Sequence, residues 1–415
     1  MIGDHSVAPT PSVSTARDLH YFGPGPKRML CLDGGGVRGV ITVAFLERIE
    51  QVLSEREGRD IRLGDWFDLV GGTSTGAVIA GALALGYRTT DLKDFYMRLA
   101  PRVFRRSYWR IFGWHAKFDA EALRREIVGI VGDRTLDSED LITGICVIAK
   151  RMDTGSPWII SNNPKAPFWN TPGDRAYIGN RHYRLANLVR ASTAAPVYFD
   201  PELLPIIDGE LHGLFLDGGV TPHNNPSLAL FLMTTLKAYG ICWPTGPERL
   251  LVCSIGTGSY RSRLSAVDAR RIRALGVAVR ALGSLMDDAS NLVAALMQWM
   301  GDSPTAWPIN SEVGTLQDDS PPGGPWFRFL RYNVTFEIEW LSDMLDLKLS
   351  ERDVWRVRQM DDASTIPLAY EIGKRAAERQ VKIEHFDQKR EVDISLTAKC
   401  RARHQAWGGR SGRWR

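Results

Sequence analysis

Three short segments of the chain carry residues that together can perform acyl transfer. Residues 33–39 read DGGGVRG, residues 72–76 read GTSTG, and residues 217–219 read DGG. Acyl transfer needs a nucleophile, a base that takes its proton, and hydrogen-bond donors for the charge that develops on the carbonyl oxygen. Each segment contains residue types that can supply one of these three parts.

The serine of the second segment stands in a Gly-x-Ser-x-Gly pattern made by Gly72, Ser74 and Gly76. The apolar segment 66–70 before it reads as a buried strand, and the Ala-rich segment 77–85 after it reads as a buried helix. A strand, a sharp turn and a helix form the context in which this pattern presents a serine hydroxyl. The alternative is an ordinary strand-to-helix turn, and the flanking segments favour the nucleophile.

The glycine loop at 33–39 lies between a predicted strand at 28–32 and a predicted helix at 41–55. Backbone N–H groups in such a loop can hold a phosphate or an oxyanion. Arg38 adds a positive charge beside these donors. A plain flexible turn is the third interpretation of this loop.

The nucleotide-binding fingerprints fit the glycine loop incompletely. The Walker form requires Lys followed by Ser or Thr after its last glycine, whereas Val40 follows Gly39. The dinucleotide form, Gly-x-Gly-x-x-Gly, is satisfied in spacing by Gly34, Gly36 and Gly39. A nucleotide site therefore stays open as an alternative to the oxyanion hole.

The third segment supplies a carboxylate. Asp217 follows residues 214–216, which read as a short strand, and Gly218 and Gly219 allow a sharp turn after it. A carboxylate at a strand end can accept the proton of a serine hydroxyl. An Asp that caps the next turn is the alternative for Asp-Gly, and the presence of the other two segments favours the base.

In their order and spacing, these three segments resemble the signature of the patatin-like phospholipases. Three further segments are similar to blocks of that family, at residues 191–199, 224–226 and 254–258. The resemblance extends over residues 28–260.

The resemblance implies a Ser–Asp dyad, with Ser74 as the nucleophile and Asp217 as the base. It implies hydrolysis of acyl esters of phospholipids and related lipids, with no metal and no other cofactor. It also implies an oxyanion hole in the glycine loop, to which we assign Gly34, Gly35, Gly36 and Arg38. The glycines expected to support the motifs are Gly39, Gly72, Gly76, Gly218 and Gly219.

A histidine after the acid would instead suggest a hydrolase triad. Among eight histidines, His212 and His223 lie near Asp217 in the sequence. His223 stands in the turn-rich segment 221–226, which is typical of a solvated side chain, so we keep it as a minor candidate. In a dyad, Asp217 must act directly on the serine, and partial burial would favour this by raising its pKa.

Composition is that of an ordinary soluble protein. The chain has 415 residues, 44% hydrophobic and 24% charged, with a formal net charge of +4. Its five cysteines show no metal spacing and no disulfide framework, which suits a reducing compartment. The longest uncharged run, 69–87, contains the serine motif and reads as core. We therefore expect a cytoplasmic protein that contacts membranes only peripherally.

Predicted strands and helices alternate along the catalytic part of the chain. Strands are predicted at 28–32, 66–70, 141–149, 214–216 and 249–255. Helices are predicted at 41–55, 74–85, 91–99, 119–131 and 227–239. Alternation of this kind predicts an α/β fold with a mainly parallel sheet sandwiched by helices. The resemblance implies the three-layer form of this fold, and the apolar segment after residue 260 predicts an extra helical C-terminal region. All three motifs fall at carboxyl ends of predicted strands, where such sheets bind ligands.

The chain divides into four predicted parts. Residues 1–26 form a flexible N-terminal tail, 27–260 a patatin-like catalytic domain, 261–396 a helical or mixed extension packed on the core, and 397–415 a basic tail. Basic and aromatic residues alternate in segment 101–118, which fits a cap on the core or a membrane contact. Segment 266–300 is predicted to form one or two long helices. Three roles stay open for them, namely part of the core, a lid or a subunit interface.

We expect a phospholipase A-type enzyme whose partner is a phospholipid or another acyl lipid. Nucleic acid is not an expected partner. Bacterial members of the family that it resembles include effectors switched on by a small nucleotide, so a nucleotide-responsive regulator stays open. The other alternative is a protein that interacts at the membrane surface and whose catalytic residues are inactive. The sequence leaves the oligomeric state and the lipid headgroup open.

Overall fold

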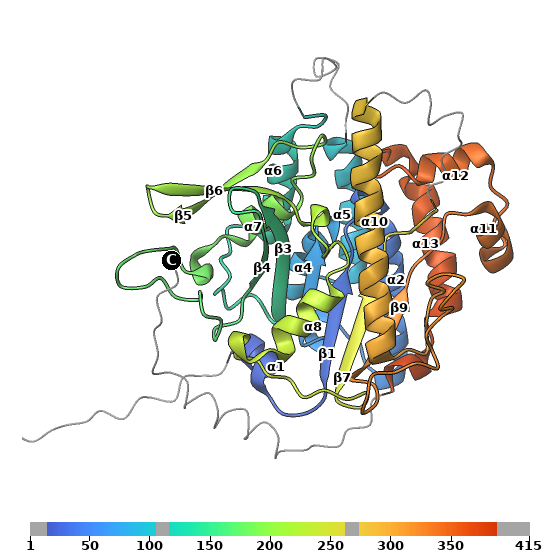
Figure 1. Ribbon diagram of the computed structural model, residues 1–415, viewed down its shortest axis with the longest axis horizontal. Coiled ribbons are helices and arrows are strands. Elements are labelled where there is room, and N and C mark those ends of the chain that lie inside the picture. The colour runs from blue at the N-terminus through green and yellow to red at the C-terminus, as the bar shows by residue number, and fades with distance from the viewer. Residues whose placement is uncertain (1–14, 105–115, 262–273, 388–415) are drawn as a thin grey trace, which may run out of the picture.

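The computed structural model describes residues 15–104, 116–261 and 274–387. In these residues a sheet of nine strands crosses the molecule (Figure 1). In spatial order its strands are β5 (Glu202–Ile207), β6 (Leu211–Asp217), β3 (Gly144–Arg151), β2 (Leu69–Thr73), β1 (Lys27–Leu32), β7 (Leu250–Ile255), β9 (Phe327–Tyr332) and β8 (Gly301–Asp302), and β4 (Ser156–Ser161) pairs with β3.

The centre of the sheet is parallel and one side of it is antiparallel. Strands β3, β2, β1, β7, β9 and β8 pair in parallel. Strands β4 and β6 run antiparallel to β3, and β5 and β6 form an antiparallel hairpin. The predicted α/β class with a mainly parallel sheet is confirmed.

Buried residues on the two faces of the sheet form two separate hydrophobic clusters. In β1, Leu30 and Leu32 belong to one cluster, whereas Met29 and Cys31 belong to the other. This alternation follows from the two-residue period of a strand. Because both faces are buried, the central strands are apolar throughout.

Helices cover each face. The larger cluster includes side chains from α2 (Gly39–Glu57), α3 (Leu63–Trp66), α4 (Thr75–Ala84), α5 (Thr89–Val103), α6 (Ala120–Val131), α7 (Leu185–Ser192), α11 (Ile338–Leu345), α12 (Glu351–Val357) and α13 (Ile366–Gln380). The other cluster includes side chains from α1 (Ala16–Phe22), α8 (Ser227–Thr235) and α10 (Ala274–Met300). In the view of Figure 1, α10 runs in front of the sheet.

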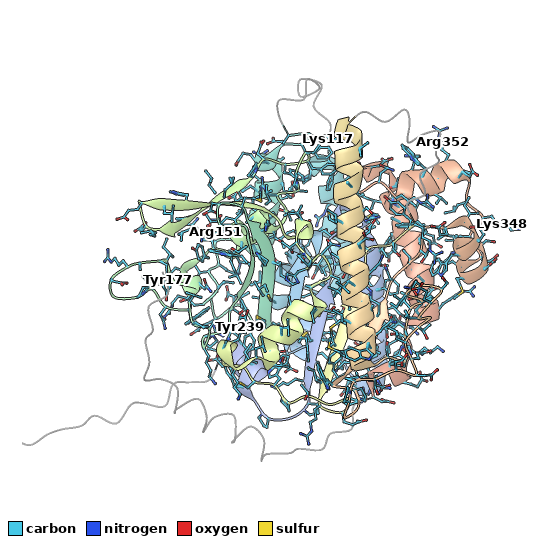
Figure 2. All side chains as sticks on the ribbon, viewed as in Figure 1. Lys117, Arg151, Tyr177, Tyr239, Lys348 and Arg352 are labelled. Atoms are coloured by element: carbon cyan, nitrogen blue, oxygen red, sulfur yellow. The ribbon has the colours of Figure 1, made fainter. Side chains whose placement is uncertain are left out.

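The C-terminal region contributes to the sheet as well as packing on it. Strand β9 continues the sheet from β7, and α13 packs along α2. Lys348 and Arg352 project from the α11–α12 side of the molecule (Figure 2). The domain boundary at residue 260 stays a prediction, but the sheet itself extends across it.

Part of the predicted N-terminal tail is folded. Helix α1 begins after Thr15, whose hydroxyl accepts the N–H of Asp18 and so caps the helix. Tyr21 is buried and donates a hydrogen bond to Asn162. The expectation of a flexible segment is therefore wrong for residues 16–22, because one buried aromatic side chain ties them to the core. The basic C-terminal tail and most of the basic–aromatic segment, residues 105–115, lie outside the described residues.

None of the described helices is long and apolar enough to cross a membrane.

Candidate active site

Ser74 occupies the sharp turn between β2 and α4. Its backbone has φ 54° and ψ −122°, a strained conformation that a non-glycine residue seldom adopts. Close backbone approach explains the glycines on either side of it. A Cβ on Gly72 would lie 2.2 Å from the backbone of Gly76, and one on Gly76 would lie 2.2 Å from the carbonyl oxygen of Leu32. The turn thus lifts the serine hydroxyl clear of the strand end.

The serine hydroxyl donates a hydrogen bond to Asp217. The distance between Ser74 Oγ and Asp217 Oδ2 is 2.6 Å. The other carboxylate oxygen accepts the backbone N–H of Gly219 at 2.7 Å, which fixes the orientation of the carboxylate. A base within hydrogen-bond reach of a hydroxyl has the geometry that proton transfer requires.

Asp217 lies in an environment that makes it a stronger base than an ordinary aspartate. Its side chain is buried, and burial raises its pKa from 3.8 to about 6, although the hydrogen bonds from Ser74 and Gly219 act in the opposite direction. Desolvation has this effect because it penalises the charged form. At neutral pH the carboxylate is therefore mostly ionised and ready to accept a proton.

The glycine loop places two backbone amides beside the serine. Gly35 and Gly36 line the same cavity as Ser74. Gly36 has φ 61°, and a Cβ there would lie 2.2 Å from the carbonyl oxygen of Met360, so only glycine fits. The amides of Gly35 and Gly36 have no acceptor among the described residues, whereas that of Gly34 donates to the carbonyl oxygen of Asn224 at 3.2 Å. Gly34 is thus engaged elsewhere.

Arg38 points toward the C-terminal region. Its buried guanidinium donates to the carbonyl oxygen of Arg358 at 3.5 Å and lies 5.8 Å from the ring centre of Phe336. Arg38 does not line the cavity that contains Ser74. Its assistance to the oxyanion stays a prediction, and this geometry favours a role in packing the loop.

No histidine in the described part of the chain forms a hydrogen bond with Ser74 or Asp217. The backbone oxygen of His223 accepts a hydrogen bond from the hydroxyl of Thr73 at 2.6 Å. Burial lowers the pKa of the His223 imidazole, and its Nδ1 has no partner. His223 therefore holds the serine turn through its backbone rather than through its ring.

Comparison with known families matches this part of the chain to one family model. The model describes patatin-like phospholipases, and it matches residues 30–231, which include the serine turn, the glycine loop and Asp217. Residues 30–231 form a patatin-like phospholipase domain.

Curated relatives match about half of the chain. The chain is 32% identical over 213 residues to a "cGAMP-activated phospholipase" of Vibrio cholerae, a match that covers 48% of this chain and 55% of the relative. It is 29% identical over 268 residues to "Patatin-like protein 4" of Arabidopsis thaliana, covering 59% and 63%. The matches thus span little more than half the length of these relatives.

Among solved structures, VipD from Legionella pneumophila is similar to this chain with a TM-score of 0.33 and 14% identity. That match covers 86% of this chain and 67% of VipD.

An apolar cavity of about 270 Å³ opens at the serine of the patatin-like domain. Helices α4, α5 and α6 and the segment 195–199 supply most of its wall, and α10 contributes Gly283 and Met286. Ser74, Asp217 and the glycine-loop residues Gly35 and Gly36 line this cavity together. The cavity therefore places the hydroxyl of Ser74 beside a space lined mainly by apolar side chains.

Ser192 belongs to the candidate site, although no sequence motif predicted a role for it. Its Oγ accepts the backbone N–H of Ser74 at 2.8 Å and donates to the carbonyl oxygen of Ile148 at 2.6 Å. The side chain therefore ties the strained serine turn to β3. The similarity of segment 191–199 to a block of the patatin-like family is the only sequence signal that points to Ser192.

A buried ion pair braces the start of the glycine loop. Arg331 on β9 donates two hydrogen bonds to Asp33, with nitrogen–oxygen distances of 2.6 and 3.0 Å, and a third to Ser254 Oγ at 2.7 Å. Both charged side chains are buried. Arg331 lies about 300 residues from its partner, beyond the part matched by the family model, so the sequence pattern contained no signal for this contact.

Proposed function

We propose that this protein is a lipid acyl hydrolase of phospholipase A type, in which Ser74 and Asp217 act as a catalytic dyad. The observation that carries the proposal is the 2.6 Å hydrogen bond between their side chains in the wall of an apolar cavity. Membership of residues 30–231 in a phospholipase family supports the same chemistry.

The proposed reaction proceeds in two steps. Asp217 takes the proton of Ser74 Oγ as this oxygen attacks the ester carbonyl carbon, and the backbone amides of Gly35 and Gly36 donate to the resulting oxyanion. The protonated Asp217 then gives its proton to the departing alcohol oxygen, which leaves an acyl group on Ser74. In the second step Asp217 takes a proton from water, the water oxygen attacks the acyl carbon, and the fatty acid leaves as Ser74 recovers its proton.

The cavity supports a fatty acyl ester as the substrate. Its wall is formed largely by aliphatic and aromatic side chains, including Val78, Ile79, Leu92, Phe95, Leu123 and Ile130. Burial of a hydrocarbon chain against such a wall is favourable by about 0.8 kcal/mol for each methylene group. A polar acyl group would lose its hydration there without finding hydrogen-bond partners.

The experiment that tests the proposal is active-site labelling with a fluorophosphonate probe. Wild type, Ser74→Ala and Asp217→Asn are incubated with the probe, and the modified residue is mapped by mass spectrometry. We expect a single adduct on Ser74, no adduct in Ser74→Ala, and much slower labelling of Asp217→Asn. Labelling of Ser74→Ala at the wild-type rate, or lipid ester hydrolysis by a pure preparation of it, would refute the dyad.

A nucleotide activator is a second proposal, which rests on relatives described as cGAMP-activated phospholipases. The same labelling experiment tests it when it is repeated with and without added cGAMP. Faster labelling of Ser74 in the presence of the nucleotide would support activation. An unchanged rate over a wide range of nucleotide concentration would oppose it.

A further inference from the structure

Helix α10 presents opposite faces to the catalytic cavity and to solvent. On its inner face, Gly283 and Met286 line the cavity together with Ser74 and Asp217. The Met286 methyl group lies 3.3 Å from the place that a Cβ on Gly219 would occupy. The N-terminal half of the helix thus forms part of the cavity wall at the reacting end.

Anchoring of α10 is concentrated in its C-terminal half. Val293, Met297 and Met300 are buried in the cluster on this face of the sheet. Gln298 is also buried, and its side chain exchanges hydrogen bonds with the backbone of Trp307 and donates one to the backbone of Thr315, all at 2.7–2.9 Å. These contacts fix the direction of the helix as it passes the cavity.

The outer face of α10 is exposed and carries large apolar side chains on both sides of Asp288. Val277, Leu285, Leu292 and Trp299 are each more than a third exposed. They follow one another at intervals of seven or eight residues, which is about two helical turns, so they lie on one side of the helix. Helix α8 packs beside α10 and adds the exposed side chains of Leu232 and Leu236.

We propose that this outer face, defined by Val277, Leu285, Leu292, Trp299, Leu232 and Leu236, docks on a phospholipid bilayer. The inference rests on the proposed function, because the cavity on the inner side of the same helix would receive a lipid acyl chain. A bilayer is where such chains are found, and docking by α10 brings the cavity wall to its surface. Leucine and tryptophan side chains on one face of a helix suit shallow insertion at the headgroup boundary.

The size of this face favours a bilayer over a protein partner. Stable protein interfaces are broad, with roughly 20–30 residues on each side, whereas the exposed large apolar side chains here are confined to one stripe along α10 and to Leu232 and Leu236 beside it. Shallow insertion into lipid needs only a few apolar side chains. Asp288 stands on this face, three residues after Leu285 and four before Leu292. A neutral phosphatidylcholine vesicle is therefore the appropriate probe, since an anionic surface would repel this carboxylate.

The test compares two double variants in the Ser74→Ala background, in which vesicles stay intact. The first, Leu285→Gln with Leu292→Gln, changes side chains that are 65% and 61% exposed. The matched control, Leu203→Gln with Leu211→Gln, changes leucines that are 60% and 42% exposed on the β5–β6 hairpin, away from α10 (Figure 1). Binding to phosphatidylcholine vesicles is measured by co-sedimentation.

We expect the α10 variant to bind vesicles at least about tenfold more weakly than its parent and the hairpin variant to bind like the parent. With Ser74 restored, the α10 variant should lose turnover on vesicles but hydrolyse a soluble short-chain ester as wild type does. Equal binding by the two variants would overturn the proposal. So would a wild-type dimer that the α10 changes convert to a monomer, because the face would then be a protein interface.

Failure of the proposed function would be recognised separately. Vesicle binding is measured without Ser74, so it does not depend on catalysis. Vesicle binding through α10 without hydrolysis of vesicles or soluble esters would support the docking surface and refute the proposed enzymatic activity. Hydrolysis of soluble esters together with equal vesicle binding by all variants would support the enzymatic activity and refute the docking surface.

Discussion

Ser74 and Asp217 meet because strands β2 and β6 end against consecutive residues of β3. Thr73 at the end of β2 pairs with Ile148, and Asp217 at the end of β6 pairs with Ala149. Strand β4 occupies the other edge of β3 along the whole of this stretch, so β2 and β6 share one edge and approach each other from opposite directions. The hydroxyl and the carboxylate are therefore placed by the sheet itself.

The activity of the protein should rise with pH through about 6. In the proposed dyad Asp217 must be ionised to accept the serine proton, and burial raises its pKa to about 6. We expect kcat/KM for a soluble ester to fall about tenfold for each pH unit below this value and to level off above it. A profile measured from pH 4 to 8 checks this. If kcat/KM instead fell only near pH 4, close to the ordinary pKa of an aspartate, the role given to the buried carboxylate would be contradicted.

Replacement of Asp217 by Asn should stabilise the fold at neutral pH while removing activity. The folded-state pKa of Asp217 is raised above the ordinary 3.8, so folding favours the protonated carboxyl. Its contribution to the free energy of unfolding is fully present below about pH 4 and is lost as the pH rises through 6. The full shift corresponds to about 3 kcal/mol.

Denaturant unfolding of wild type and Asp217→Asn at pH 4 and pH 8 measures this difference. We expect the variant to be the more stable protein at pH 8 and the two to be similar at pH 4. An equal difference at both values would mean that the charge of Asp217 is not its cause.

Ser192→Ala should slow catalysis through the position of Ser74. The variant removes the acceptor of the Ser74 N–H and leaves the strained turn less firmly held. Loss of one such hydrogen bond corresponds to about a tenfold fall in kcat, with KM unchanged because Ser192 does not line the cavity. Ser192→Thr keeps a hydroxyl and should restore part of the rate.

Steady-state kinetics on a soluble ester, together with thermal unfolding, separates positioning from stability for Ser192. A variant that loses thermal stability but keeps kcat would show a purely structural role.

Arg331→Met should destabilise the protein by about 3–5 kcal/mol, because it leaves the Asp33 carboxylate buried without its partner. The double variant Asp33→Asn with Arg331→Met should recover much of this loss, since no charge then stays unpaired. Denaturant unfolding of the two single variants and the double variant gives the coupling energy. Additive effects would show that the two side chains do not depend on each other.

The sequence predicted the local elements around the candidate site well. Helices α2, α4 and α6 lie within a few residues of their predicted ends, because turn glycines and an apolar or amphipathic pattern are encoded nearby. In α6 the cap is local too, since the Asp119 side chain accepts the N–H of Glu121. The serine turn is local in the same sense, as Gly72 and Gly76 are required by contacts within the strand–turn–helix unit and with the neighbouring β1.

Contacts between distant segments could not be predicted in this way. The sequence placed Asp217 at a strand end but did not show that β6 runs antiparallel to β3. It also gave no sign that Ser192 holds the serine turn or that Arg331 reaches Asp33. The glycine-loop pattern predicted the backbone position of Arg38. Contacts with the C-terminal region determine where its guanidinium lies.

The sequence by itself therefore determined which residues are candidates for the chemistry, because a serine turn, a glycine loop and an Asp-Gly-Gly turn are short patterns with local physical causes. Only the tertiary structure decided how they meet. Strand direction, the burial that raises the pKa of Asp217, and the position of α10 beside the cavity all arise from packing between segments far apart in the chain.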